Sequence, residues 1–77
     1  MVSYTRHAEK RMAERRFAKG DVEFCLGNYS TSYPDKKGNP IYIAFLPDGR
    51  AIKVVTRKGS SNPTVVITVA PWEVGEL

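Results

Sequence analysis

The stretch IYIAFLPDGRAIKVVTR, residues 41–57, predicts a β-hairpin. Its two arms, Ile41–Leu46 and Ala51–Arg57, are rich in the β-branched and aromatic side chains that favour strands. The Pro47-Asp48-Gly49 segment between them is a strong hairpin-turn signal. We therefore expect two adjacent antiparallel strands at the centre of the fold.

Two further strands are expected on either side of this hairpin. Tyr29–Tyr33 precedes it, and the β-branched run Thr64–Ala70 follows it and is typical of a central strand. Turn-forming residues separate these strands from the hairpin, at Pro34–Pro40 and at Gly59–Pro63. After Pro71, we expect a short tail over Trp72–Leu77. The four strands then form an antiparallel meander.

The first part of the chain has helical periodicity. Thr5–Phe17 predicts one helix, with Ser3 or Thr5 as its N-cap, and Lys19–Leu26 predicts a shorter one that ends at Gly27-Asn28. The order α-α-β-β-β-β indicates an α+β fold, in which two N-terminal helices pack on one face of a four-stranded antiparallel meander sheet. With 77 residues, we expect a single domain over residues 1–77.

The cysteine content and the hydropathy of the chain limit the cellular compartments in which we expect it. Cys25, the only cysteine, shares a helical apolar pattern with Val22 and Leu26, which predicts a buried free thiol in a reducing compartment. We find no signal-peptide pattern and no long apolar run. These features predict a cytoplasmic, soluble protein without a membrane-binding segment.

The charge distribution suits a polyanionic partner. Lys and Arg number 12 against 8 Asp and Glu, for a net charge of +4. The excess gathers before Gly20 and again at Lys53, Arg57 and Lys58. Such clustering is typical of domains that bind nucleic acid or an acidic protein. A merely solvated basic surface is the alternative.

Strand alternation assigns side chains to the two faces of the expected sheet. Ile52 and Val54 should face the helices, and in the last strand so should the apolar set Val65, Ile67 and Val69. The opposite face is then open, basic and hydroxyl-bearing, which is a reasonable surface for RNA. The residues expected on or beside this RNA-binding face are Lys53, Arg57, Lys58, Thr68 and Tyr42.

His7, Arg11 and Arg15 recur at i, i+4 and i+8 in the first helix. At about 100° per residue they fall within about 80° of one another, on the stripe that also carries Ala8 and Met12. This stripe should meet the core, where charge is costly unless it is paired or used. It is therefore either a functional site or a structural polar network.

The chemistry-bearing residues exclude several kinds of site. One histidine, one cysteine and scattered acids give no metal-ligand spacing, and no glycine-rich loop predicts a cofactor phosphate site. An imidazole beside several cations instead suits metal-independent cleavage of RNA. In that chemistry His7 is the general acid or base, and Arg11, Arg15 and Lys53 stabilise the charge that develops on the phosphate.

Short motifs carry a resemblance over nearly the whole chain. They are Thr5-Arg6-His7-Ala8, Arg11-Met12, Glu14-Arg15, Phe17, Asp21-Val22 and the strand Val66-Ile67-Thr68-Val69 closing at Pro71. These motifs resemble a small bacterial domain-of-unknown-function family of the 4258 type. That family is similar to the RelE/ParE-like toxin superfamily, within the barnase–EndoU–colicin–RelE fold.

The resemblance implies a RelE-like α+β fold, ribonuclease activity and a toxin or toxin-derived role with a cognate antitoxin-like protein. Carried over by position, the polar signature falls on His7, Arg11, Arg15 and Thr68, with Thr68 orienting the scissile phosphate. The chain also departs from the family pattern in three places. Arg16 stands where glycine is usual, Ala18 where a Ser or Thr helix cap is usual, and Ala70 where an aromatic residue is common.

Two functions remain open from the sequence. The first is an RNA-binding or RNA-cleaving toxin-like domain, a metal-independent endoribonuclease in its catalytic form. The second is a non-catalytic interaction domain with a buried His/Arg network, which binds a protein or nucleic acid. The location of His7 distinguishes them: a cleft beside Lys53 and Arg57 favours the enzyme, and burial under the sheet favours the network.

Overall fold

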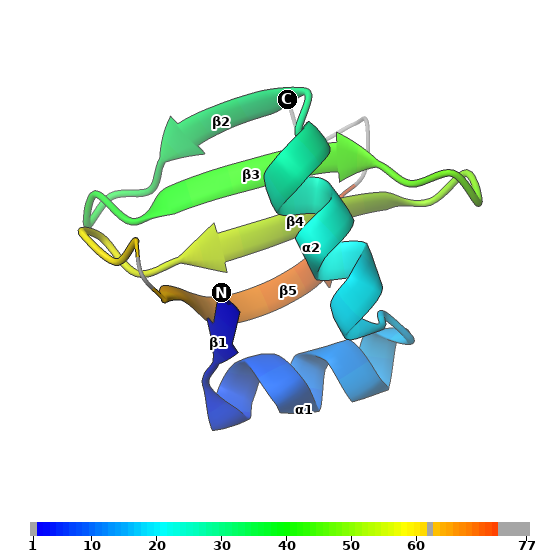
Figure 1. The fold of residues 1–77 in the computed structure, drawn as a ribbon, viewed down its shortest axis with the longest axis horizontal. Coiled ribbons are helices and arrows are strands. Elements are labelled where there is room, and N and C mark those ends of the chain that lie inside the picture. The colour runs from blue at the N-terminus through cyan, green and yellow to red at the C-terminus, as the bar shows by residue number, and fades with distance from the viewer. Residues whose placement is uncertain (1, 62, 73–77) are drawn as a thin grey trace.

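The chain folds into a five-stranded mixed sheet with two helices (Figure 1). The structure is a computed structural model that describes residues 2–61 and 63–72. The helices are α1 (Arg6–Arg15) and α2 (Lys19–Asn28). The strands are β1 (Val2–Tyr4), β2 (Thr31–Pro34), β3 (Pro40–Phe45), β4 (Ala51–Thr56) and β5 (Thr64–Pro71), and their order in the sheet is β1-β5-β4-β3-β2.

The predicted antiparallel meander is confirmed for β2 to β5, but the prediction of a four-stranded sheet is wrong. β1 adds a fifth strand that runs parallel to β5, with Val2 opposite Thr64 and Tyr4 opposite Val66. A strand of three residues is too short to show a period of two, so its identity comes from pairing with the free edge of β5. The part of the expected tail at residues 73–77 lies outside the described residues.

Local interactions explain where the helices begin. Thr5 is the N-cap of α1: the Ala8 amide donates to Thr5 Oγ1 at 3.1 Å, and this hydroxyl donates to the Ile67 carbonyl of β5 at 3.0 Å. Ala18, at the N-cap of α2, has no side-chain acceptor. There the Asp21 carboxylate instead accepts from the Ala18 amide at 2.9 Å. Both helix starts are therefore stabilised by hydrogen bonds to otherwise unpaired backbone amides.

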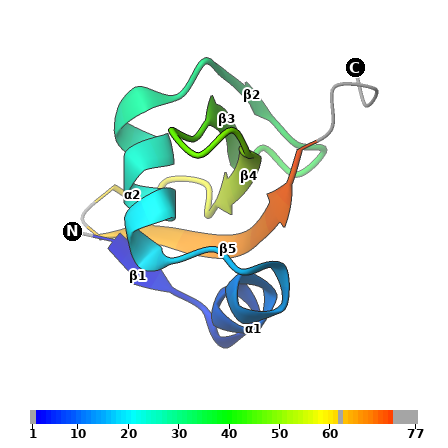
Figure 2. The same ribbon diagram turned by 90° about the vertical axis from the view of Figure 1, so that its right-hand side faces the viewer.

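One core joins the helices to one face of the sheet. α1 packs on β5 and β1, and α2 packs on β3 and β4. Figure 2 looks along the sheet nearly end-on, and in this view α2 lies on one side of the curved sheet. The buried apolar cluster consists of Ala8, Met12, Phe17, Val22, Cys25, Ala44, Leu46, Ile52, Val54, Val66 and Val69. In residues 2–61 and 63–72, neither helix has the length and apolar character needed to cross a bilayer.

A β-bulge changes the expected alternation in β5. Thr56 pairs with Val66 but its neighbour Val55 pairs with Thr68, so Ile67 is an extra residue on the β5 side. The buried pair is therefore Val66 and Val69, whereas strict alternation predicted Val65 and Ile67 alongside Val69. The prediction for Thr68 is unaffected, because Thr68 pairs with Val55 on the face opposite the core.

Candidate nucleic-acid interface

The face of the sheet opposite the core is not covered by any helix or strand of the described residues. Cross-strand pairing defines which side chains share this face, because directly paired residues point the same way. We call it the open face. It consists of Thr31, Tyr33, Ile41, Ile43, Phe45, Ala51, Lys53, Val55, Thr68 and Ala70.

The middle of the open face is apolar and its ends carry aromatic rings. Ile43 pairs with Thr31 of β2 and Lys53 of β4 and is only 2% exposed. Phe45 is 55% exposed, and its ring meets Trp72 edge-to-face with 5.9 Å between ring centroids. Exposed aromatic rings of this kind can stack nucleobases.

Lys53 supplies a cation at the centre of this apolar surface. It lies between Ile43 of β3 and Ala70 of β5, and its side chain is half-buried. In the part of the chain that the structure describes, the ion pairs use other cations, namely Arg11, Lys19 and Arg50. Lys53 is therefore placed to meet an anion that lies across the open face.

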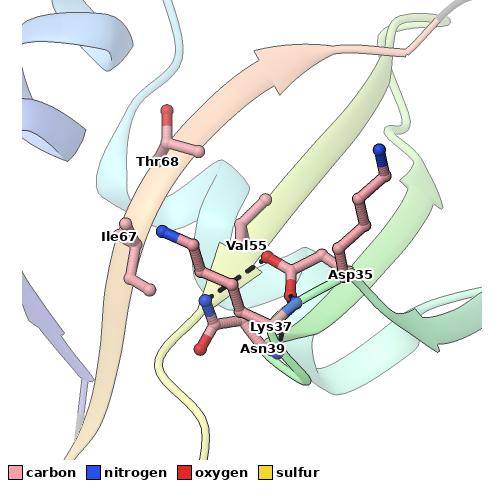
Figure 3. Close-up of a pocket in the computed structure, with 7 residues that line it drawn as sticks. Asp35, Lys37, Asn39, Val55, Ile67 and Thr68 are labelled. Carbon is pink, nitrogen blue, oxygen red and sulfur yellow. Dashed lines mark hydrogen bonds between the residues drawn. The ribbon is translucent and has the colours of Figure 1, made fainter.

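An open hollow of about 450 Å³ lies at one end of the open face (Figure 3). The loop between β2 and β3 lines one side and the strands β4 and β5 line the other. The lining residues are Asp35, Lys36, Lys37, Asn39, Val55, Ile67 and Thr68. Val55 and Ile67 are apolar, whereas the loop side carries two ammonium groups. The hollow thus combines a charged rim with an apolar wall.

Asp35 organises the loop that forms this rim. Its Oδ1 accepts from the amides of Lys37 and Asn39, both at 2.8 Å, and its Oδ2 accepts from Asn39 Nδ2 at 3.3 Å. These hydrogen bonds, led by the Asn39 amide, lower the pKa of the Asp35 carboxyl. Asn39 Oδ1 in turn accepts from the Lys58 amide at 3.0 Å, which ties this loop to the β4–β5 loop.

The helix stripe predicted to face the core is divided between the core and the surface. His7, Arg11 and Arg15 all lie at the surface of α1, and Ala8 and Met12 alone carry the helix into the core. Arg11 makes a surface ion pair with Glu14 at 3.2 Å. The buried His/Arg network considered from the sequence is therefore wrong. The surface formed by His7, Arg11 and Arg15 is called the α1 flank below.

The other predicted residues divide between the two faces. Lys53 and Thr68 lie on the open face, and Arg57 and Lys58 are exposed in the β4–β5 loop beside it. The placement of Tyr42 on this face is wrong. Tyr42 pairs with the buried Val54. Its ring packs against the ring of Tyr29, with 4.9 Å between the ring centroids, and its carbonyl accepts a hydrogen bond from Cys25 Sγ of α2. Because β3 alternates, Ile41, Ile43 and Phe45 face outward instead.

Sequence reasoning missed several residues that the structure brings to the open face. The sequence places Lys36, Lys37 and Asn39 only in a turn, and Trp72 only in a short tail. The run Ile41–Phe45 is apolar or aromatic throughout, so its alternation alone does not show that Phe45 is exposed. No pattern in the sequence indicates that the two loops meet.

Cys25 is not a candidate nucleophile. The side chain is fully buried in the core, as predicted, and burial raises the pKa of its thiol to about 11. A reactive cysteine needs a lowered pKa and access to solvent. Among the described residues, no three His, Cys, Asp or Glu side chains come together as metal ligands would.

The described residues form a small α+β domain whose core lies on one face of a mixed sheet and whose opposite face carries Lys53. The chain belongs to the family described as Domain of unknown function (DUF4258), whose sequence profile matches residues 4–71. The matched region extends from the end of β1 to the end of β5, so it includes both helices and the whole open face. No curated protein and no solved structure matches the chain significantly.

Proposed function

We propose that this domain binds single-stranded RNA across the open face. One observation carries the proposal: the helices cover only one side of the sheet, and the other side presents exposed aromatic rings around a central lysine. Bases stack on aromatic side chains, and lysines neutralise the phosphates between them. The net charge of +4 favours the same polyanionic partner.

Single-stranded RNA fits this surface better than duplex DNA. Reading the major groove of DNA commonly requires a helix or ribbon that can enter the groove. The open face is formed by strands of one sheet, and within the described residues it presents no helix that could enter the groove. An open sheet with exposed aromatic residues instead suits unpaired bases. The Thr68 hydroxyl adds a group that can hydrogen-bond a ribose or phosphate.

The catalytic form of the proposal is a metal-independent endoribonuclease with His7 as the general acid or base. Its support is the exposure of the only imidazole together with two guanidinium groups on the α1 flank. The motifs of α1 and β5 resemble a family that is expected to be similar to RelE/ParE-like toxins, and this is a second reason to test cleavage. The alternative is a non-catalytic interaction domain, with an antitoxin-like protein among its candidate partners.

Fluorescence anisotropy with labelled RNA tests the binding proposal. Phe45→Ala should weaken binding about 5- to 150-fold, because the loss of one base–aromatic stacking contact costs about 1–3 kcal/mol of binding free energy. Tyr29→Ala is the matched control, because Tyr29 is similarly exposed but packs beside Tyr42 on the other side of the sheet. Lys53→Glu should weaken binding far more than Lys10→Glu, which makes the same charge change on the exposed side of α1.

Salt dependence provides a further check on the same complex. Affinity for RNA should fall steeply as salt rises, because phosphates that bind lysines release counterions. The proposal would be contradicted if Phe45→Ala and Tyr29→Ala changed the affinity equally. It would also be contradicted if neither salt nor Lys53→Glu changed the affinity. If His7 transfers a proton, His7→Ala should slow RNA cleavage by about two to four orders of magnitude without changing binding. If the wild-type protein binds RNA but never cleaves it, the catalytic form is refuted and the non-catalytic form remains.

A further inference from the structure

We infer that the hollow binds the terminal phosphate of a nucleotide, with the attached nucleoside against its apolar wall. This inference rests on the proposed RNA binding and specifies which part of the ligand occupies which part of the surface. Its basis is the meeting of two loops and the β5 bulge at one end of the open face. The ligand chemistry is a phosphomonoester on a nucleoside, at the end of an RNA strand or on a free nucleotide.

Three ammonium groups belong to this end of the molecule. Lys36 and Lys37 line the hollow. Lys58 comes from the other loop and lies against Gly38: a Cβ built on Gly38 would sit 3.2 Å from Lys58 Cδ and 3.5 Å from its Nζ. The two loops are held together by the hydrogen bond from the Lys58 amide to Asn39 Oδ1. The positive charges are thus contributed by connected segments rather than by a single flexible loop.

The carboxylate in the hollow offsets only one of these three positive charges. Asp35 is the only acidic residue among those that line it, and its two oxygens accept three hydrogen bonds from its own loop. Hydrogen bonds from neutral amides leave the carboxylate its negative charge, so the three lysines and Asp35 together carry a net charge of about +2. A terminal phosphate carries about −1.5 to −2 charge near neutral pH, against −1 for a phosphate within the chain. The excess therefore matches the end of a strand better than its interior.

The remaining lining residues suit the rest of a nucleotide. Val55 and Ile67 form an apolar wall, and the Thr68 hydroxyl and Asn39 amide lie at its polar margin. The volume of about 450 Å³ falls within the range of about 300–1,000 Å³ for small-molecule sites. The bulge at Ile67 places two consecutive β5 residues, Ile67 and Thr68, at the same hollow.

The position of the hollow explains why a strand would end there. Phe45 and Ile41 lie four residues apart on β3, so the aromatic end of the open face is about 14 Å from the row that leads into the hollow. Lys53 lies between these ends. An RNA strand that stacks a base on Phe45 and passes Lys53 meets the tied loops at the far end. Its terminal phosphate would then lie against Lys36 and Lys37.

Short RNAs of identical sequence that carry a 5′-phosphate, a 3′-phosphate or only hydroxyl ends provide the test. The full chain is titrated with each RNA by fluorescence anisotropy, and with a nucleoside monophosphate by amide NMR. One phosphorylated end should bind about tenfold tighter or more than the hydroxyl form, the gain expected from charge-assisted hydrogen bonds. The nucleoside monophosphate should shift the amides of Lys37, Asn39 and Thr68 selectively.

Variants then assign the preference to the hollow. Lys36→Ala with Lys37→Ala should remove the preference for the phosphorylated end, whereas Lys10→Ala should leave it unchanged. Thr68→Val keeps the side-chain shape and should reduce the preference without lowering the thermal midpoint. Lys37→Gln alone, which keeps the side chain polar, is a second variant should the double substitution disturb the loop.

The outcomes separate this inference from the proposed function. If all three RNAs bind equally and Lys53→Glu still weakens them, RNA binding stands and the phosphate site is refuted. If no RNA binds but the nucleoside monophosphate shifts the hollow amides, the site stands for free nucleotides and RNA binding fails. A preference for phosphorylated ends that survives both lysine substitutions would overturn the assignment to the hollow.

Discussion

The end of α1 provides a stability prediction that is independent of function. Arg16 has φ 62° and ψ 41°, and it is the only residue other than glycine with positive φ in residues 2–61 and 63–72. Its amide donates to the Ala13 carbonyl and the Phe17 amide donates to the Met12 carbonyl at 2.9 Å, which is the Schellman pattern of helix termination. Glycine is the residue that this position favours, so Arg16→Gly should stabilise the protein.

The size of the effect follows from two opposing terms. A left-handed conformation costs a residue with a Cβ about 1–2 kcal/mol. Glycine loses more backbone freedom on folding, which costs about 0.5–1 kcal/mol. The Arg16 carbonyl, which accepts from Arg50 Nη1 at 2.7 Å, belongs to the backbone and is kept. The net gain should be about 0.5–1 kcal/mol, or a rise of about 2–8 °C in the thermal midpoint of a domain this small.

Thermal and urea unfolding followed by circular dichroism would measure this gain. Lys10→Gly is the matched control, because Lys10 is exposed in the middle of α1, and it should lose about 0.5–1 kcal/mol. Arg16→Ala separates the side chain from the backbone and should change stability little, since alanine keeps the strain. If Arg16→Gly is no more stable than wild type while Lys10→Gly behaves as expected, the reasoning from backbone strain is refuted.

Two further predictions concern residues whose placement the structure settles. Arg11→Ala and Arg15→Ala should each lower the free energy of unfolding by under about 0.5 kcal/mol, like Lys10→Ala. Met12→Ala should lower it by about 2–5 kcal/mol, because Met12 is 5% exposed. A large loss of stability at either arginine in thermal melts would contradict the exposed α1 flank. The Cys25 thiol should react with a thiol reagent only on unfolding. Its pKa is about 11 in the folded state and about 8.5 when unfolded, so stability should fall as pH rises between these values, and Cys25→Ala should lack that fall in urea midpoints.

The strands with clear local signals could be predicted from the sequence. The Pro47-Asp48-Gly49 turn and the β-branched runs on either side specify the β3–β4 hairpin, and Thr64–Pro71 follows the same logic. β1 could not be found in this way, because three residues become a strand only through pairing with β5. The bulge at Ile67 is also invisible to alternation, since it arises from the match between β4 and β5.

The residues of the candidate site also differ in whether the sequence could predict their positions. Lys53 could be placed on the open face because β4 is regular and its buried partners Ile52 and Val54 are apolar. Tyr42 was misplaced because every residue of Ile41–Phe45 is apolar or aromatic, so the run itself does not show which face is inward. The hollow depends on two loops that meet through Lys58 and Asn39, and that contact has no counterpart in any local pattern.

The α1 flank shows why helical periodicity located a stripe but not its environment. Successive members of His7, Arg11 and Arg15 advance by about 40° around the helix. Ala8 and Met12 lie about 20° and about 60° beyond Arg15. Two small or flexible apolar residues are enough to seat a helix of ten residues against β5, so the cationic side chains on the adjoining surface can stay in water. The cost of burying charge therefore decides the rotation of α1, and it turns the imidazole and both guanidinium groups toward solvent. Any chemistry performed by His7 must consequently occur at the surface of α1.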